Sequence, residues 1–150
     1  MGEDIDDEVV TVLSTEECWA ALRADEFGRL AYALGDEVGL VPVNYAVDDA
    51  GRDGPTLLFR TAEGSKLLGV LLHPQVVFEI DRYDEHEASS VIVRGRARRL
   101  EEDEAHRAEQ LPLRPWVPTL KYDVVEIVPE QLSGRRFVLE RPWLHARLDA

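Results

Sequence analysis

Short segments with the alternating pattern of β-strands follow one another along most of this chain, and long helical patterns are rare. The segments are rich in Val, Leu, Tyr and Phe, and turns rich in Gly, Asp and Pro separate them. They cover residues 30–34, 40–47, 56–61, 76–81, 90–98, 122–128 and 136–139. Six or seven short strands predict a mainly β fold, a single antiparallel barrel.

Three short helices are expected beside the strands. Ser14 and Glu17 have the spacing of a capping box, which begins the first helix. The second is expected over 65–72 and is stopped by Pro74, because the residue before a proline avoids the helical conformation. The charged stretch 101–110 suits a third helix on the surface. None of them is long enough to change the β character of the fold.

A chain of 150 residues and 17.0 kDa has the size of one domain. Acidic residues crowd the stretch from Glu3 to Glu8, which has little apolar surface to bury. We therefore expect a disordered acidic tail over 1–12, one barrel domain over 13–140 and a C-terminal tail over 141–150.

The formal net charge of −13 restricts the partners of this chain. It disfavours nucleic acids and anionic membranes, whose phosphates would be repelled. No apolar run reaches the roughly 20 residues of a membrane helix, and the acidic N-terminus is unlike a secretory signal. Cys18 is the one cysteine and cannot form an intramolecular disulfide. These features predict a cytoplasmic protein with no nucleic-acid or membrane partner.

Residues 59–67 carry the clearest signal of a binding site. A strand delivers Arg60 and Thr61 to a turn, which leads directly into the helix that begins at Ser65 and Lys66. The first turn of a helix offers unpaired N–H groups and the positive end of the helix dipole, which together attract an anion. The charges of Arg60 and Lys66 and the hydroxyl of Ser65 would add to this attraction. The pattern predicts a phosphate site.

The alternative is that Ser65 only caps the helix while Arg60 and Lys66 extend into solvent. The surrounding sequence favours the phosphate site. Its most specific parts are Pro-Val-Asn-Tyr at 42–45, Phe-Arg-Thr-Ala-Glu-Gly-Ser-Lys at 59–66 and Ser-Gly-Arg-Arg-Phe at 133–137. With these motifs the chain resembles the FMN-binding split barrels of the pyridoxamine 5′-phosphate oxidase-like superfamily. The short actinobacterial and nitroimidazole-reductase-like members are the most similar. The implied fold is a six- to seven-stranded antiparallel split β-barrel with a few short helices.

The resemblance implies that several residues of this chain hold FMN. Arg60, Ser65 and Lys66 would bind the flavin phosphate, and Thr61 would touch the ring or the ribityl chain. The strand would line one face of the isoalloxazine through the backbone groups of Val43, Asn44 and Tyr45. The fold does not fix the cofactor, because short relatives also use the deazaflavin coenzyme or haem.

The resemblance also implies a homodimer with two flavins at the subunit interface. Trp116 could then reach the cofactor of the partner, although a place in the interface or the core explains this residue equally well. The strand residues Val76, Phe78 and Ile80 are expected to need cover from a second subunit.

The C-terminal segment departs from the pattern of vitamin B6 oxidases. Arg141, His145 and Arg147 only superficially resemble their substrate-binding signature, because the spacing differs. We therefore expect no oxidation of pyridoxamine phosphate.

No motif for a metal site or a catalytic nucleophile accompanies the phosphate motif. Arg94, Arg96 and Arg98 share one face of a strand and are expected to pair with the surplus carboxylates. The missing nucleophile fits a flavoprotein, in which the cofactor supplies the redox chemistry.

Three functions are compatible with the sequence. The first is an FMN-dependent oxidoreductase that acts on a small organic substrate with a reduced nicotinamide or similar donor. The others are a deazaflavin-dependent reductase on the same fold and a non-catalytic flavin- or haem-binding protein.

Overall fold

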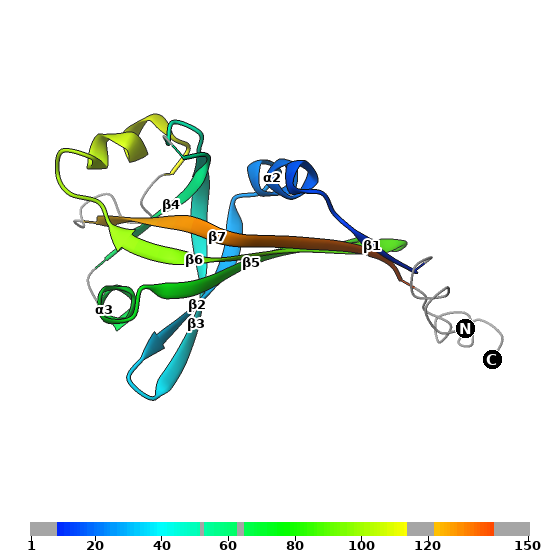
Figure 1. Cartoon of the computed structure of the whole chain (residues 1–150), viewed down its shortest axis with the longest axis horizontal. Coiled ribbons are helices and arrows are strands. Elements are labelled where there is room, and N and C mark those ends of the chain that lie inside the picture. Colours follow the sequence, from blue (N-terminus) through cyan, green and yellow to red (C-terminus); the bar gives the residue numbers. More distant parts are fainter. Residues whose placement is uncertain (1–8, 52, 63–64, 114–121, 140–150) are drawn as a thin grey trace.

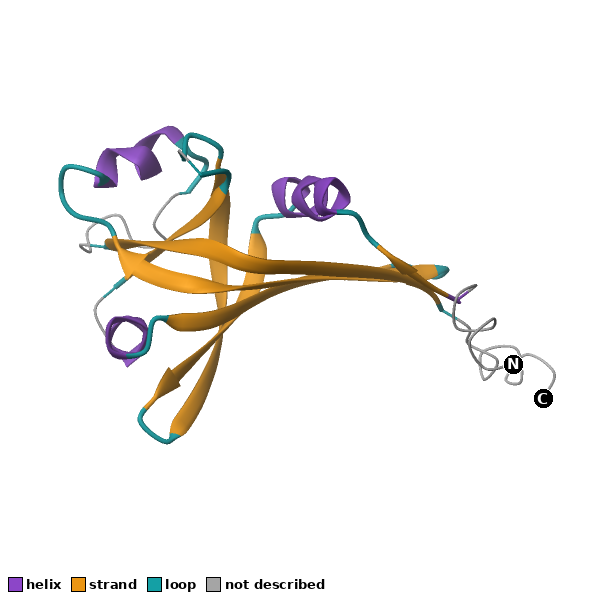
Figure 2. Cartoon of the chain, viewed as in Figure 1, coloured by secondary structure: helices purple, strands orange, loops and turns teal. Residues whose placement is uncertain are grey.

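The computed structural model describes residues 9–51, 53–62, 65–113 and 122–139, and at 65–68 it describes the backbone alone. Strands dominate and helices are short (Figure 2). In chain order the elements are β1 (Val10–Val12), α2 (Thr15–Ala24), β2 (Phe27–Leu34), β3 (Glu37–Asp48), β4 (Thr56–Thr61), α3 (Ser65–Leu72), β5 (Gln75–Tyr83), β6 (Glu87–Arg99), the 3₁₀-helix η1 (Ala105–Gln110) and β7 (Asp123–Val138).

The strands form one antiparallel sheet that closes on itself (Figure 1). Their order is β1-β7-β4-β3-β2-β5-β6, and β6 pairs back onto β7 from Glu87↔Val138 to Arg99↔Val125. Six strands therefore complete a barrel, while the short β1 adds to the far end of β7. This arrangement confirms the predicted fold class.

Alternate residues of each strand fill the barrel interior. Buried side chains from all six barrel strands form one core, and Leu22 of α2 and Val70 of α3 complete it. Val76, Phe78 and Ile80 belong to this core and are 3%, 0% and 3% exposed. The expectation that a second subunit must cover them is therefore wrong, because the period-2 pattern does not say which face of a strand points inward.

β7 is a single strand of 16 residues, although the sequence predicts two strands at 122–128 and 136–139. Pro129 interrupts the pattern, and it lies opposite Gly95 where the β6–β7 register shifts. A Cβ atom on Gly95 would lie 2.3 Å from the Val128 carbonyl oxygen. The glycine and the irregular register let β6 pass close to a residue that has no N–H to donate.

The N-terminal segment also departs from expectation. Val10–Val12 form β1 and pair with β7, so the expected tail is ordered at these residues. Of the expected N-terminal tail, residues 1–8 lie outside the described residues, and so does the whole expected C-terminal tail over 141–150. α2 begins with the predicted capping box, in which Glu17 N donates to Ser14 Oγ at 3.1 Å.

A second, smaller core lies on the outer face of the barrel, under η1. It joins apolar residues of β3, β4 and β7 to the segment after β6: Ala46, Leu58, Leu100, Ala108, Leu113 and Val124. The expected surface helix over 101–110 is in fact the shorter η1, which starts at Ala105. None of the helices in the described part of the chain combines the length and apolar composition needed to cross a bilayer.

Candidate functional site

The barrel opens where β3 and β4 separate. Their pairing runs from Asp48↔Thr56 only as far as Tyr45↔Phe59. Beyond that point β4 continues against β7, and β3 continues against β2 as far as Glu37. Among the described residues, no strand therefore pairs with the β4-facing edge of β3 over its first half. We call this stretch, residues 38–42, the open edge.

The register shows which backbone groups the open edge presents. Tyr45 donates its amide to the Glu26 carbonyl oxygen, 2.9 Å away on the β2 side. Because successive residues of a strand turn their backbone groups to opposite sides, those of Val38, Leu40 and Pro42 face away from β2. Pro42 has no N–H to donate. Because its backbone faces away from β2, the β2–β3 pairing loses no hydrogen bond at this residue. The open edge thus offers carbonyl oxygens and amides to a ligand.

The side chains of three predicted site residues point into the barrel. Val43, Tyr45 and Thr61 are 5%, 1% and 4% exposed. The Tyr45 hydroxyl donates to the Leu22 carbonyl oxygen at 2.6 Å, and burial raises the pKa of this phenol far above its ordinary value. The Thr61 hydroxyl donates to the Ala62 carbonyl oxygen at 3.1 Å. The side chains of these three residues are therefore not available to an external ligand.

The side chain of Asn44 lies on the outer face of the barrel. Among the three predicted residues of β3, Asn44 is the one whose backbone groups turn toward β4. Its side-chain amide donates to the Glu26 carbonyl oxygen at 3.2 Å, which fixes its orientation beside the opening. The backbone of Val43, opposite Gly28, faces β2 like that of Tyr45. Of the three residues predicted from the Pro-Val-Asn-Tyr motif, Asn44 is therefore the best placed for contact with a ligand.

Arg60 also lies on the outer face and is half-buried. Its Nε–H donates to the Leu113 carbonyl oxygen at 2.9 Å. The described residues provide no other partner for this guanidinium. Since an arginine carries five N–H donors, the anchored Nε leaves the two terminal nitrogens for an anion.

Three residues separate the end of β4 from the start of α3, so the N-terminus of α3 follows Arg60 and Thr61 closely in the chain. Ser65 and Lys66 are its first two residues, and its first turn contains no acidic residue. Asp123, opposite Thr61 on β7, is paired with Arg99 at 3.5 Å. An arginine and a helix N-terminus without an acid in its first turn are a donor set that fits a phosphate.

Two parts of the prediction are not described by the structure. The side chains of Ser65 and Lys66 lie outside the described residues, and so does the whole of Trp116. No group of three or more His, Cys, Asp or Glu side chains in the described ranges is arranged to hold a metal ion.

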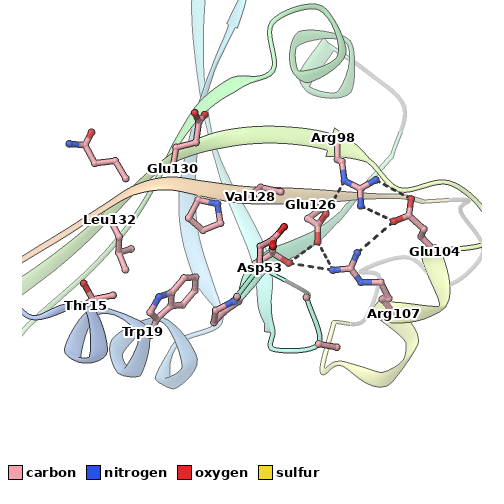
Figure 3. Close-up of a pocket in the computed structure, with 17 residues that line it drawn as sticks. Thr15, Trp19, Asp53, Arg98, Glu104, Arg107, Glu126, Val128, Glu130 and Leu132 are labelled. Atoms are coloured by element: carbon pink, nitrogen blue, oxygen red, sulfur yellow. Dashed lines mark hydrogen bonds and ion pairs between the residues drawn. The ribbon is translucent and has the colours of Figure 1, made fainter.

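A second feature, which the sequence did not single out, lies near the other end of β4. A hollow of about 610 Å³ separates α2 from η1, and Trp19 and Leu132 line one end of it (Figure 3). At the other end is a group of charged side chains that we call the η1 cluster: Asp48, Arg98, Glu104, Arg107 and Glu126. Arg98 pairs with carboxylates here, as predicted, whereas the sequence carries no signal that could have identified Asp48 or Glu126 as its neighbours.

Comparison with known proteins places the chain in a family. The family model described as pyridoxamine 5′-phosphate oxidase matches residues 14–136. This chain belongs to the pyridoxamine 5′-phosphate oxidase family. The expected resemblance is thereby confirmed, and it spans nearly all the residues that form the barrel.

Several solved structures superimpose well on the chain. A conserved protein of unknown function from Corynebacterium diphtheriae is 38% identical, with a TM-score of 0.76 over 86% of this chain and 98% of the other. The FAD binding protein from Mycobacterium smegmatis is 36% identical, with a TM-score of 0.72 over 87% and 100%. A FAD-binding protein from Mesorhizobium loti is 27% identical, with a TM-score of 0.72 over 85% and 97%.

Proposed function

We propose that this chain binds a flavin nucleotide, specifically FMN, at the opening between β3 and β4 and acts as an oxidoreductase. The observation that carries the proposal is the position of Arg60. Its guanidinium is anchored through Nε on the strand that leaves β3 at this point, and a helix N-terminus follows it closely in the chain. Two relatives of this chain are FAD-binding proteins, which supports a flavin.

The proposed site offers cationic and N–H donors to the phosphate of a flavin nucleotide and backbone groups to its ring. Arg60, the first amides of α3 and the side chains of Ser65 and Lys66 would hold the phosphate. Asn44 and the open edge would meet the polar rim of the isoalloxazine through backbone groups. When bound, the flavin would supply two-electron redox chemistry between a reduced nicotinamide or similar donor and a small organic acceptor.

Ligand titration tests this proposal directly. The purified chain is titrated with FMN, FAD and riboflavin, and any cofactor released on denaturation is identified by its mass. We expect one FMN per chain and weaker binding of riboflavin, which lacks the phosphate. Deazaflavin or haem in the released fraction would contradict the choice of FMN, and binding of none of these would refute the cofactor site.

Turnover tests the second half of the proposal. We expect slow, donor-dependent reduction of quinone-like or nitroaromatic acceptors and no hydrogen peroxide from pyridoxamine phosphate. A flavin-loaded protein that is inactive with every donor and acceptor would instead point to a binding protein.

A second copy of the chain is the partner that we propose for the β2–β3 hairpin. Val38 and Leu40 are 80% and 68% exposed, and they lie on the open edge itself. A second copy packed there would cover these side chains and enclose a flavin bound at the same edge. Light scattering on the flavin-loaded chain should show a dimer, and Leu40→Glu should produce the 17.0 kDa monomer. A wild-type monomer at micromolar concentration would contradict this assembly.

A further inference from the structure

The η1 cluster joins several elements of the chain through charged contacts, and Figure 3 shows those among Arg98, Glu104, Arg107 and Glu126. Arg107 of η1 pairs with Asp48 of β3 at 2.7 Å and with Glu126 of β7. Arg98 of β6 pairs with Glu126 at 2.9 Å and with Glu104, at the start of η1, at 2.7 Å. Glu126 also accepts a hydrogen bond from the Thr56 hydroxyl at 2.8 Å.

Two of the carboxylates in this cluster are deeply buried. Asp48 and Glu126 are 4% and 3% exposed, and Arg107 contacts both of them. Buried ion pairs of this kind contribute little net stability compared with apolar residues, but they define a geometry. Here the geometry that they define is the position of η1 on the outer face of the barrel.

The position of η1 determines where Leu113 lies. Leu111 N donates to the Ala108 carbonyl oxygen at 3.3 Å, and Leu113 N donates to the Leu111 carbonyl oxygen at 2.7 Å, so the chain stays tightly turned after η1. Leu113 then enters the small outer core and is 3% exposed. Its carbonyl oxygen is the acceptor that anchors Arg60.

We propose that Arg107 is a positioning residue of the phosphate site, acting through η1 and the Leu113 carbonyl oxygen on the guanidinium of Arg60. This inference rests on the proposed flavin binding. Arg107 itself lies toward the other end of β4, where its Nη2 is 3.5 Å from the Thr56 hydroxyl. It touches no part of the ligand, and it acts only on the group that meets the phosphate.

A comparison of FMN with riboflavin isolates this role. The two ligands share the isoalloxazine and the ribityl chain and differ only in the phosphate. We expect Arg107→Met to weaken FMN binding roughly tenfold, a typical coupling within one contact network, and to leave riboflavin binding within about twofold of wild type. Arg96→Met is the matched control, because Arg96 is an exposed arginine on the outer face of β6 with no acidic partner among the described residues.

A double-mutant cycle with Arg60 shows whether Arg107 acts on FMN binding through the Arg60 guanidinium or through a general loss of structure. In an Arg60→Met background, Arg107→Met should weaken FMN binding no further, because the guanidinium on which Arg107 acts is already absent. An equal loss of FMN and riboflavin affinity, or a full additional loss in the Arg60→Met background, would overturn the inference.

Arg107→Met leaves two buried carboxylates without their partner, so a milder variant keeps the test decisive. Asp48→Asn preserves the shape of the side chain and removes one of the charges that hold Arg107. We expect the same selective loss for FMN, smaller in size. An unchanged preference for FMN over riboflavin in this folded variant would refute the positioning role. A wild-type chain that shows no preference for FMN would instead refute the proposed phosphate site.

Discussion

The Nε–H of Arg60 donates to the carbonyl oxygen of Leu113, 2.9 Å away, across 53 positions of sequence. This hydrogen bond joins the end of β4 to the segment that follows η1. It anchors the guanidinium through Nε, and the terminal nitrogens have no partner among the described residues.

Arg60→Met should weaken FMN binding roughly 10- to 100-fold, because one or two charge-assisted hydrogen bonds to the phosphate are lost. Riboflavin binding should change little. Quenching of flavin fluorescence measures both affinities. Arg94→Met, which removes an exposed arginine from the outer face of β6, is the control and should behave as wild type. Equal FMN affinity in the two variants would place the phosphate elsewhere.

Ser65→Ala combined with Lys66→Ala should also weaken FMN while leaving the fold intact. Both residues begin α3, and Val70 is the core contact of this helix among its described side chains. Calorimetric titration gives the affinity, and circular dichroism reports the fold. Binding as tight as that of wild type would show that the backbone of α3 and Arg60 suffice without these side chains.

Tyr45→Phe should destabilise the chain by about 1–2 kcal/mol without changing flavin affinity. The substitution removes the buried hydrogen bond to Leu22 and leaves that carbonyl oxygen unsatisfied. Urea unfolding gives the free energy, and Tyr83→Phe, at a residue that is 77% exposed, is the control. A loss of flavin affinity would mean that the Tyr45 side chain serves the site.

Gly95→Ala should destabilise the barrel by roughly 1–3 kcal/mol, the usual range for overpacking. The new Cβ would lie 2.3 Å from the Val128 carbonyl oxygen, a backbone atom that cannot rotate away. Thermal unfolding measures the effect, and Arg94→Ala at the neighbouring exposed residue provides the comparison. A variant as stable as wild type would show that β7 can shift at Pro129.

The pH dependence of stability should include a contribution from Glu104. Hydrogen bonds from the Arg98 guanidinium lower the pKa of this carboxyl below its ordinary value. A carboxyl with a lowered pKa in the folded state stabilises the fold above its unfolded pKa of about 4.3, and this contribution disappears as the pH falls through the folded pKa. Glu104→Gln should therefore flatten the fall in melting temperature between about pH 5 and pH 3. Glu102→Gln, at an exposed neighbouring residue, should leave it unchanged.

The sequence predicted the fold because each strand carries its own local pattern. The capping box at Ser14 and Glu17 and the helix over 65–72 follow from neighbouring residues and are present in the structure. The continuity of β7 could not be predicted, because it depends on Gly95, which is more than 30 residues away in the chain. The local sequence pattern shows where residues alternate as in a strand. Whether Pro129 ends the strand depends on the facing strand β6, which the local pattern does not contain.

For the candidate site, the sequence predicted which segment carries the donors but not which way each side chain points. Spacing identified Arg60, Ser65 and Lys66 as one segment, but it could not show that Thr61 and Tyr45 turn their side chains inward. That outcome depends on which face of the strand meets the core. The η1 cluster escaped prediction for another reason: its charged residues come from three strands, from η1 and from the residue before η1, and only the closed barrel brings them together.

The long strand β7 has a consequence for how this chain folds as it is synthesised. β7 pairs with β4, with β6 and, through Val10↔Phe137, with the first strand. A ribosome must therefore release nearly the entire domain before the barrel can close, and many native contacts join residues far apart in sequence. High contact order of this kind slows folding and leaves apolar strands exposed meanwhile. Until β7 emerges, the edges of β4 and β6 that it pairs with stay open in the nascent chain.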